Sequence, residues 1–169
     1  MNLHIGGTEA REGWTILNIQ PGPGVDYVGT ALDLGMFADQ SVEQVYASHV
    51  LEHLGYQEDL VTALKEIRRV LKPGGILKMS VPDLDILCRL FVHPDVKAED
   101  RFLIMRMMFG GQVNEHDFHR VGLNWDFLLY FLNQAGFTRA RRVEEFGLFD
   151  DTSSMRLHGT LISLNVEAW

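Results

Sequence analysis

Histidines and carboxylates gather in two short segments, and side chains of these types can bind a metal ion or move a proton. The first segment, His49-Val50-Leu51-Glu52-His53, fits the H-x-x-E-H pattern of one group of metalloproteases. Histidines at positions i and i+4 of a helix can share a zinc ion. The segment directly follows an apolar run and is followed closely by Gly55, which leaves little room for a helix. We therefore rank a metal-dependent hydrolase using His49, Glu52 and His53 last among the functions that the sequence allows. We expect no resident metal.

The second segment is Glu115-His116-Asp117-Phe118-His119. Its two histidines lie three residues apart beside carboxylates, so they could bind a metal or act as general bases toward a substrate. A solvated polar loop without a catalytic role is the competing interpretation. We predict that His116 and His119 are the catalytic residues of the chain.

A glycine pair, Gly6-Gly7, follows a short apolar run at residues 2–5. Glycines after a strand allow the backbone to approach a ligand closely. Taken alone, the pair is more typical of an ordinary tight turn than of a ligand site, so its interpretation depends on the elements that surround it.

The elements that must position these residues alternate between strands and helices. Helical spacing of Leu60, Leu64, Ile67 and Leu71 predicts a helix over residues 57–71, and Pro73-Gly74-Gly75 ends it. Further helices are predicted over residues 82–91, 98–109 and 123–135. The predicted strands cover residues 2–5, 14–19, 26–29, 42–48, 76–81, 138–145 and 160–167.

This order predicts a Rossmann-like α/β fold, with a mostly parallel sheet and helices on both faces. The last two strands have no helix between them, which predicts an antiparallel strand at one edge. Only about six residues separate Gly7 from the second strand, whereas a full crossover needs about a dozen or more. We therefore expect the first crossovers to be reduced.

Composition describes an ordinary globular protein, and 169 residues suit a single domain over residues 1–169. The formal net charge of −8 disfavours nucleic acid as a partner. No segment is long and apolar enough for a membrane span, and no secretory signal is expected at the N-terminus. Cys88 is the only cysteine, so an internal disulfide is excluded and a cytoplasmic location is the simplest expectation.

Four segments together resemble the class I S-adenosylmethionine-dependent methyltransferases, in particular the small type 11 group. The glycine turn resembles the first motif of that family, and three further segments follow in the family's order. The four segments are Leu3-His4-Ile5-Gly6-Gly7-Thr8, Ala47-Ser48-His49-Val50-Leu51-Glu52-His53-Leu54, Leu64-Lys65-Glu66-Ile67-Arg68-Arg69-Val70-Leu71-Lys72-Pro73-Gly74-Gly75 and Ala135-Gly136-Phe137.

The resemblance implies S-adenosyl-L-methionine as cofactor and a binding site at the carboxyl ends of the strands. Gly6, Gly7, Ser48, His49 and His53 are the cofactor-binding residues that it implies.

Two positions depart from the family, which usually has a third glycine where Thr8 stands and an acid where Gln20 stands. We hypothesise that Gln20 binds the ribose and that Asp33, with Leu34, meets the adenine. Thr30 also lies near the position at which the family often has an acid that meets the adenine.

The implied reaction is an in-line methyl transfer, for which the protein must mainly hold the acceptor beside the methyl group and exclude water. The implied acceptor is a small molecule, a sugar or glycan, or a lipid. The family elaborates its substrate site where the His116 segment lies. Because Thr8 and Gln20 depart from the pattern, a non-catalytic or weakly cofactor-binding module is the alternative. Exposed strand edges could support a homodimer.

Overall fold

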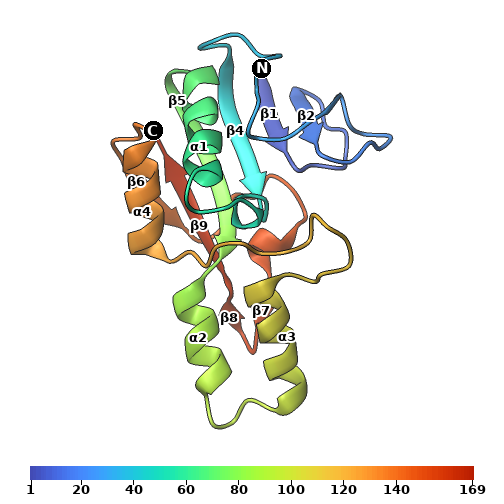
Figure 1. Ribbon diagram of the computed structural model, residues 1–169, viewed down its shortest axis with the longest axis vertical. Helices are drawn as coiled ribbons and strands as arrows, with labels where there is room; N and C mark the ends of the chain where they lie inside the picture. The colour runs from blue at the N-terminus through green and yellow to red at the C-terminus, as the bar shows by residue number, and fades with distance from the viewer.

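Seven strands form the central sheet of the protein, and the computed structural model describes every residue from Met1 to Trp169 (Figure 1). In chain order the strands are β1 (Asn2–Ile5), β2 (Trp14–Asn18), β3 (Tyr27–Val28), β4 (Val42–Ser48), β5 (Leu71–Pro82), β6 (Ala140–Val143) and β9 (Ser163–Ala168). Their order across the sheet is β3-β2-β1-β4-β5-β9-β6.

The first five strands of that order are mutually parallel. Strand β9 lies between β5 and β6 and is antiparallel to both. The mostly parallel Rossmann-like sheet with an antiparallel strand is therefore confirmed, with β9 one place inside the edge. Because β2 and β4 flank β1 on opposite sides, the strand order reverses between β1 and β4, and ligands of such sheets bind at this point.

Two helices, α1 (Asp59–Val70) and α4 (Trp125–Gln134), cover one face of the sheet and contact each other. The buried residues of α1 recur at helical spacing and include Leu60, Leu64 and Ile67. They pack on alternate strand residues such as Leu3 and Val45, which point to the same face because strand side chains alternate. This face holds the main hydrophobic core.

The opposite face is covered differently. His4 and Tyr46 point to it, and the Phe149 ring lies over both, at centroid distances of 4.1 Å and 5.1 Å. The 3-10 helix η2 (Thr152–Ser154) is the helix of this face, and the Tyr46 hydroxyl donates a 2.7 Å hydrogen bond to Asp151 just before it. Burial lowers the pKa of His4 to about 4 and raises that of Tyr46 to about 12. Helices thus lie on both faces: the α-helices α1 and α4 on one, and the single turn η2 on the other.

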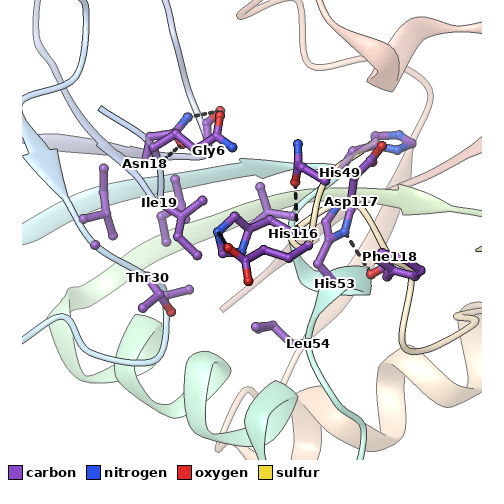
Figure 2. A pocket seen from close by; sticks show the side chains of 18 of the residues that line it. Gly6, Asn18, Ile19, Thr30, His49, His53, Leu54, His116, Asp117 and Phe118 are labelled. Atoms are coloured by element: carbon purple, nitrogen blue, oxygen red, sulfur yellow. Dashed lines mark hydrogen bonds and ion pairs between the residues drawn. The ribbon is translucent and has the colours of Figure 1, made fainter. Parts of the chain in front are cut away.

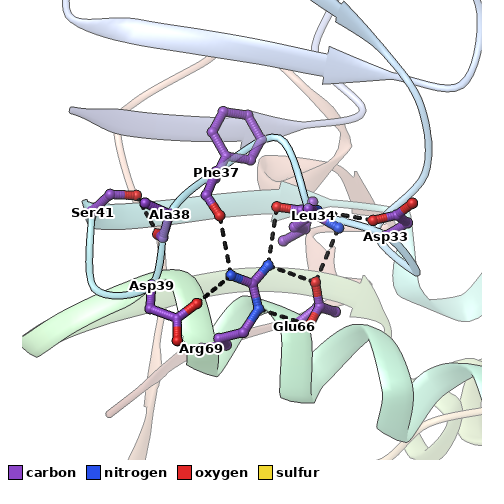
Figure 3. Close-up of polar contacts among 9 residues, drawn as sticks. Asp33, Leu34, Phe37, Ala38, Asp39, Ser41, Glu66 and Arg69 are labelled. Atoms are coloured by element: carbon purple, nitrogen blue, oxygen red, sulfur yellow. Dashed lines mark hydrogen bonds and ion pairs between the residues drawn. The ribbon is translucent and has the colours of Figure 1, made fainter.

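The connections after β1 and β2 contain no helix, as predicted from their length, and the longer connection after β3 contains none either. A guanidinium clamp holds the longest of them, residues 29–41, against α1 (Figure 3). Arg69 donates two hydrogen bonds to Glu66, two to the carbonyl oxygens of Leu34 and Phe37, and one to Asp39. Glu66 in turn accepts the Leu34 N–H at 3.1 Å. The clamp places Leu34 and Phe37 in the core without a helix between β3 and β4.

A second, smaller cluster of buried hydrophobic residues lies beyond the sheet. Helices α2 (Leu84–Val92) and α3 (Ala98–Phe109) pair there with a short hairpin of β7 (Arg156–Leu157) and β8 (Thr160–Leu161) (Figure 1). Its buried residues are Leu87, Val96, Ile104 and Ile162. The hairpin was not predicted, because residues 160–167 read as one strand. None of the helices has the length and apolar character needed to cross a bilayer.

Candidate functional site

A pocket of about 490 Å³ opens where the carboxyl ends of β1, β2, β3 and β4 meet. Residues 113–118 and Arg120, from the connection between α3 and α4, form its other wall. Figure 2 shows Gly6 and Asn18 on one side of the pocket and His53 and His116 on the other. The pocket therefore lies at the point where the strand order reverses, as the sequence predicts for a cofactor site.

The glycine turn after β1 is held by the end of β2. Asn18 donates its side-chain amide to the carbonyl oxygens of Gly6 (3.1 Å) and Gly7 (2.9 Å) and accepts the N–H of Gln20 at 2.9 Å. Gly6 has φ +82°, a conformation that favours glycine, and a Cβ there would clash with Val50. Sequence analysis missed Asn18, because its role depends on β2 lying beside β1.

Gly7 does not line the pocket. A Cβ at Gly7 would lie 2.5 Å from Nδ1 of His4, on the opposite face of the sheet. Glycine is thus needed at this position for packing against an imidazole ring. The structure thus gives Gly7 a packing role in the turn, outside the pocket lining.

The second and third strands contribute Gln20 and Thr30 to the pocket wall. Asp33 and Leu34 lie outside it. Asp33 accepts the N–H of Gly35 at 2.9 Å, and Leu34 is fully buried in the core with its N–H on Glu66. Of the three residues considered for this position, Thr30 lines the pocket, whereas Asp33 and Leu34 do not.

Ser48 ends β4, His49 follows it, and both line the pocket. His49 has φ +53°, a left-handed conformation that is uncommon for a residue with a side chain. Its Nε2 lies 2.9 Å from the Ser163 hydroxyl, which donates to the carbonyl of Thr152. This bond anchors the end of β4 to the start of β9.

Glu52 and two histidines form a cluster behind the pocket wall. The 3-10 helix η1 (Leu51–His53) carries Glu52, whose side chain is 1% exposed, and His53, which lines the pocket. The His119 ring lies 4.8 Å from the His53 ring, centroid to centroid, and is not part of the wall. Burial lowers the pKa of His119. Because η1 is a single turn, no α-helix presents His49 and His53 together.

The loop after α3 places His116 on the wall. Gly110, at φ +86°, has no room for a Cβ because the Asp117 carbonyl lies against it. Asp117 accepts the N–H of Gln112 at 3.0 Å, and the N–H of Arg120 donates to the Glu52 carbonyl at 2.8 Å. These bonds close the loop on itself and join it to η1.

The structure thus brings together six of the ten residues predicted for the site. They are Gly6, Gln20, Ser48, His49, His53 and His116. The wall also contains Asn18, Thr30 and Arg120, and Arg120 was missed because its loop gave no periodic signal.

Residues 12–79 match the family model described as a methyltransferase domain. No curated protein matches the sequence. The matched segment runs from the start of β2 into β5 and includes the end of β4, with Ser48, His49 and His53.

Solved structures share the fold. A methyltransferase from Archaeoglobus fulgidus described as dependent on S-adenosylmethionine has a TM-score of 0.60 at 15% identity, over 99% of this chain and 84% of that one. A Burkholderia thailandensis 1,6-didemethyltoxoflavin-N1-methyltransferase with bound S-adenosylhomocysteine has a TM-score of 0.57 at 14% identity, over 99% and 69%.

A possible exported protein from Bordetella parapertussis has a TM-score of 0.60 at 13% identity, over 99% of this chain. The chain spans 60% of that protein, less than two thirds of its length.

Proposed function

We propose that the chain is a class I S-adenosylmethionine-dependent methyltransferase, which binds this cofactor in the pocket between β1 and β4 and transfers its methyl group; the match of residues 12–79 to a methyltransferase-domain model supports this. The acceptor we propose is a small molecule, a sugar or glycan, or a lipid. The observation that carries the proposal is the position of the pocket, at the carboxyl ends of four parallel strands where the order of the sheet reverses.

The residues of the pocket fit the cofactor. Its volume of about 490 Å³ lies in the ordinary range for small-molecule sites. Gly6 supplies a turn without a side chain, and Val50 lies where a Cβ would be. Gln20 would hold the ribose hydroxyls, Thr30 would lie near the adenine, and Ser48 and His49 would line the cofactor's face. When bound, the cofactor supplies a methyl group already activated on a sulfonium.

The acceptor would be held by the pocket wall that residues 113–118 and Arg120 form. Methyl transfer requires the acceptor atom in line with the methyl group and water excluded. His116, Phe118 and Arg120 line this part of the pocket, and His116 is our candidate for a general base toward a hydroxyl acceptor. His119 lies behind His53 and would act on the acceptor only through it.

A weakly binding or non-catalytic module is the second candidate, and one observation favours it. The residues that β1 to β4 contribute to the pocket wall include no carboxylate, since Gln20 and Thr30 stand where the family carries acids. A neutral hydrogen bond to ribose is about half as strong as a charge-assisted one.

Calorimetry with S-adenosylhomocysteine separates the two candidates. We expect one site per chain, with affinity lower by about 10-fold in Gln20→Ala and higher by several fold in Gln20→Glu, which introduces a charge-assisted bond. Asp33→Ala is the matched control, because Asp33 lies outside the pocket. The module without cofactor function is supported if neither wild type nor Gln20→Glu binds at millimolar ligand.

The remaining partner predictions follow from charge and exposure. We propose no nucleic-acid substrate, given the net charge of −8. Cys88 is free and exposed, which fits a reducing compartment such as the cytoplasm. Strand β6 has an unpaired edge through which two chains could associate as a homodimer.

A further inference from the structure

We propose that Glu52, His53 and His119 bind one divalent transition-metal ion, zinc being the best match, at the acceptor side of the pocket. Glu52 and His53 come from η1, and His119 comes from the loop between α3 and α4. The sequence pattern suggested a different set, because it paired His53 with His49. In the structure His119, which lies 66 positions after His53 in the chain, takes the place of His49 in this set.

The three side chains converge closely enough to share an ion. One donor atom from each lies within 4.8 Å of the other two. Nε2 of His119 is 3.9 Å from Oε1 of Glu52. Tetrahedral zinc with bonds of about 2.0–2.1 Å separates its donor atoms by about 3.4 Å. The donor atoms must therefore approach one another by at most about 1.4 Å to share an ion.

The Glu52 carboxylate needs a cation. Its side chain is 1% exposed, and neither oxygen has a hydrogen-bond partner. Burying a carboxylate without hydrogen bonds or a paired charge is strongly unfavourable. The nearest groups of opposite potential charge are the rings of His49, at 3.3 Å, and His119, at 3.9 Å. A metal ion between Glu52 and the two ligand histidines would supply the missing charge.

Both ligand histidines are held in the tautomer that a metal requires. Nδ1 of His53 is 3.1 Å from the carbonyl oxygen of Phe118, and Nδ1 of His119 is 2.9 Å from that of Met107. A carbonyl only accepts, so each ring carries its proton on Nδ1 and leaves the Nε2 lone pair free. Metal-ligating histidines are commonly oriented by this bond to a backbone carbonyl.

His49 supports the site from outside. The Ser163 hydroxyl donates to Thr152, so Nε2 of His49 must donate to Ser163. Nδ1 of His49 lies 3.3 Å from Oε1 of Glu52, so His49 limits how Glu52 can rotate.

The composition of the set resembles that of catalytic rather than structural zinc sites. Two histidines and one glutamate leave a fourth position open. His53 lines the pocket, so this position is reachable from the acceptor side. A metal there would lower the pKa of a coordinated acceptor hydroxyl. That role rests on the proposed methyl transfer, whereas metal binding itself does not.

Zinc titration of the full chain, after treatment with a chelator and without cofactor, tests the proposal. We expect one zinc ion per chain. Glu52→Gln and His119→Asn should each weaken binding by about 100-fold or more, since each removes one of three ligands. Asparagine at 119 can keep the bond to the Met107 carbonyl, so this variant should fold. His93→Asn is the control, because His93 is an exposed histidine beside a carboxylate, Asp95, and should bind zinc as wild type does.

Visible absorption of the cobalt-substituted protein gives a readout independent of affinity. We expect tetrahedral d–d bands in wild type and in His93→Asn, and their loss in His119→Asn. The proposal is overturned if wild type binds no zinc, or if Glu52→Gln and His119→Asn both bind it as wild type does. Binding of S-adenosylhomocysteine by a chain that rejects zinc would remove this inference and leave the proposed function standing.

Discussion

Two groups of neighbouring parallel strands, β4–β5 and β1–β2–β3, are connected and held in place by different means. Strands β4 and β5 are joined by an α-helix, α1, that packs an apolar stripe on the sheet. Strands β1, β2 and β3 are joined by connections without helices, and they are held instead by polar side chains: Asn18 on the glycine turn and Arg69 on residues 29–41. The comparison teaches that a few well-placed hydrogen bonds can position the strand ends of a cofactor pocket where crossover helices are absent.

This difference predicts that single polar substitutions should damage the helix-free side more than the helical side. A helix distributes its stabilisation over many apolar contacts, so losing one surface polar group costs little. The connection of residues 29–41 depends more strongly on one group, because three of its hydrogen bonds come from the Arg69 guanidinium and a fourth goes to Glu66, which Arg69 holds.

The largest effect is expected for Arg69→Ala. It removes all five hydrogen bonds of the clamp and leaves the Leu34 and Phe37 carbonyls without this partner. Hydrogen bonds to charged groups contribute about 1.5–3 kcal/mol each, in part replaceable by water at this partly exposed site. We expect a loss of about 3 kcal/mol in the free energy of unfolding, measured by urea denaturation.

Lys72→Ala is the matched control for the clamp. Lys72 follows α1 and pairs only with the exposed Glu43, so its removal should change stability little. Equal losses for Arg69→Ala and Lys72→Ala would show that the clamp does not hold the connection.

The next largest effect concerns the aromatic face and its pH dependence. The pKa of His4 is lowered to about 4 by burial, whereas the unfolded value is about 6.5. The unfolded chain therefore binds the proton first, and stability falls as the pH drops from about 6.5 toward 4. At pH 5 the loss from His4 is about 2 kcal/mol.

Thermal unfolding at pH 7.5 and pH 5 checks this in wild type and in His4→Phe, which cannot titrate. The lowered pKa of His119 acts in the same direction, so the difference between the two proteins isolates His4. The same decrease with pH in both would contradict the account of the aromatic face.

The smallest of the three effects is expected for Asn18→Ala. It removes the two bonds to the glycine turn and frees Gln20. We expect a loss of about 1 kcal/mol in stability and about 10-fold weaker binding of S-adenosylhomocysteine, because a partly exposed neutral hydrogen bond contributes about 0.5–1.5 kcal/mol.

Asn133→Ala provides the comparison on the helical side. Asn133 is exposed on α4 and should be replaceable without effect on stability or binding. If Asn18→Ala binds the ligand as Asn133→Ala does, the glycine turn is positioned by something other than Asn18.

Sequence patterns predicted what depends on periodicity. The strand over residues 42–48 and the helix over residues 98–109 have the predicted bounds, and α1 and α4 differ from theirs by one or two residues at each end. The reduced crossovers followed from chain length alone. The β7–β8 hairpin was missed because its two strands have two residues each, too short for an alternating pattern.

The site was predictable only where chain order fixes it. Gly6, Ser48 and His49 follow directly from strands whose ends meet at the reversal of the sheet. Asp33 was predicted from its charge, but it is bound to its own turn, and Thr30 lines the pocket instead. His119 approaches Glu52 only because the 110–120 loop folds back on η1, which no local pattern reveals.

A crystal structure of the chain grown with saturating S-adenosylhomocysteine tests the central claim most directly. The account predicts the ligand in the pocket between the ends of β1 and β4, with its backbone contact at Gly6, its ribose on Gln20 and its base near Thr30. A ligand bound elsewhere, or an empty pocket at saturating ligand, would contradict it.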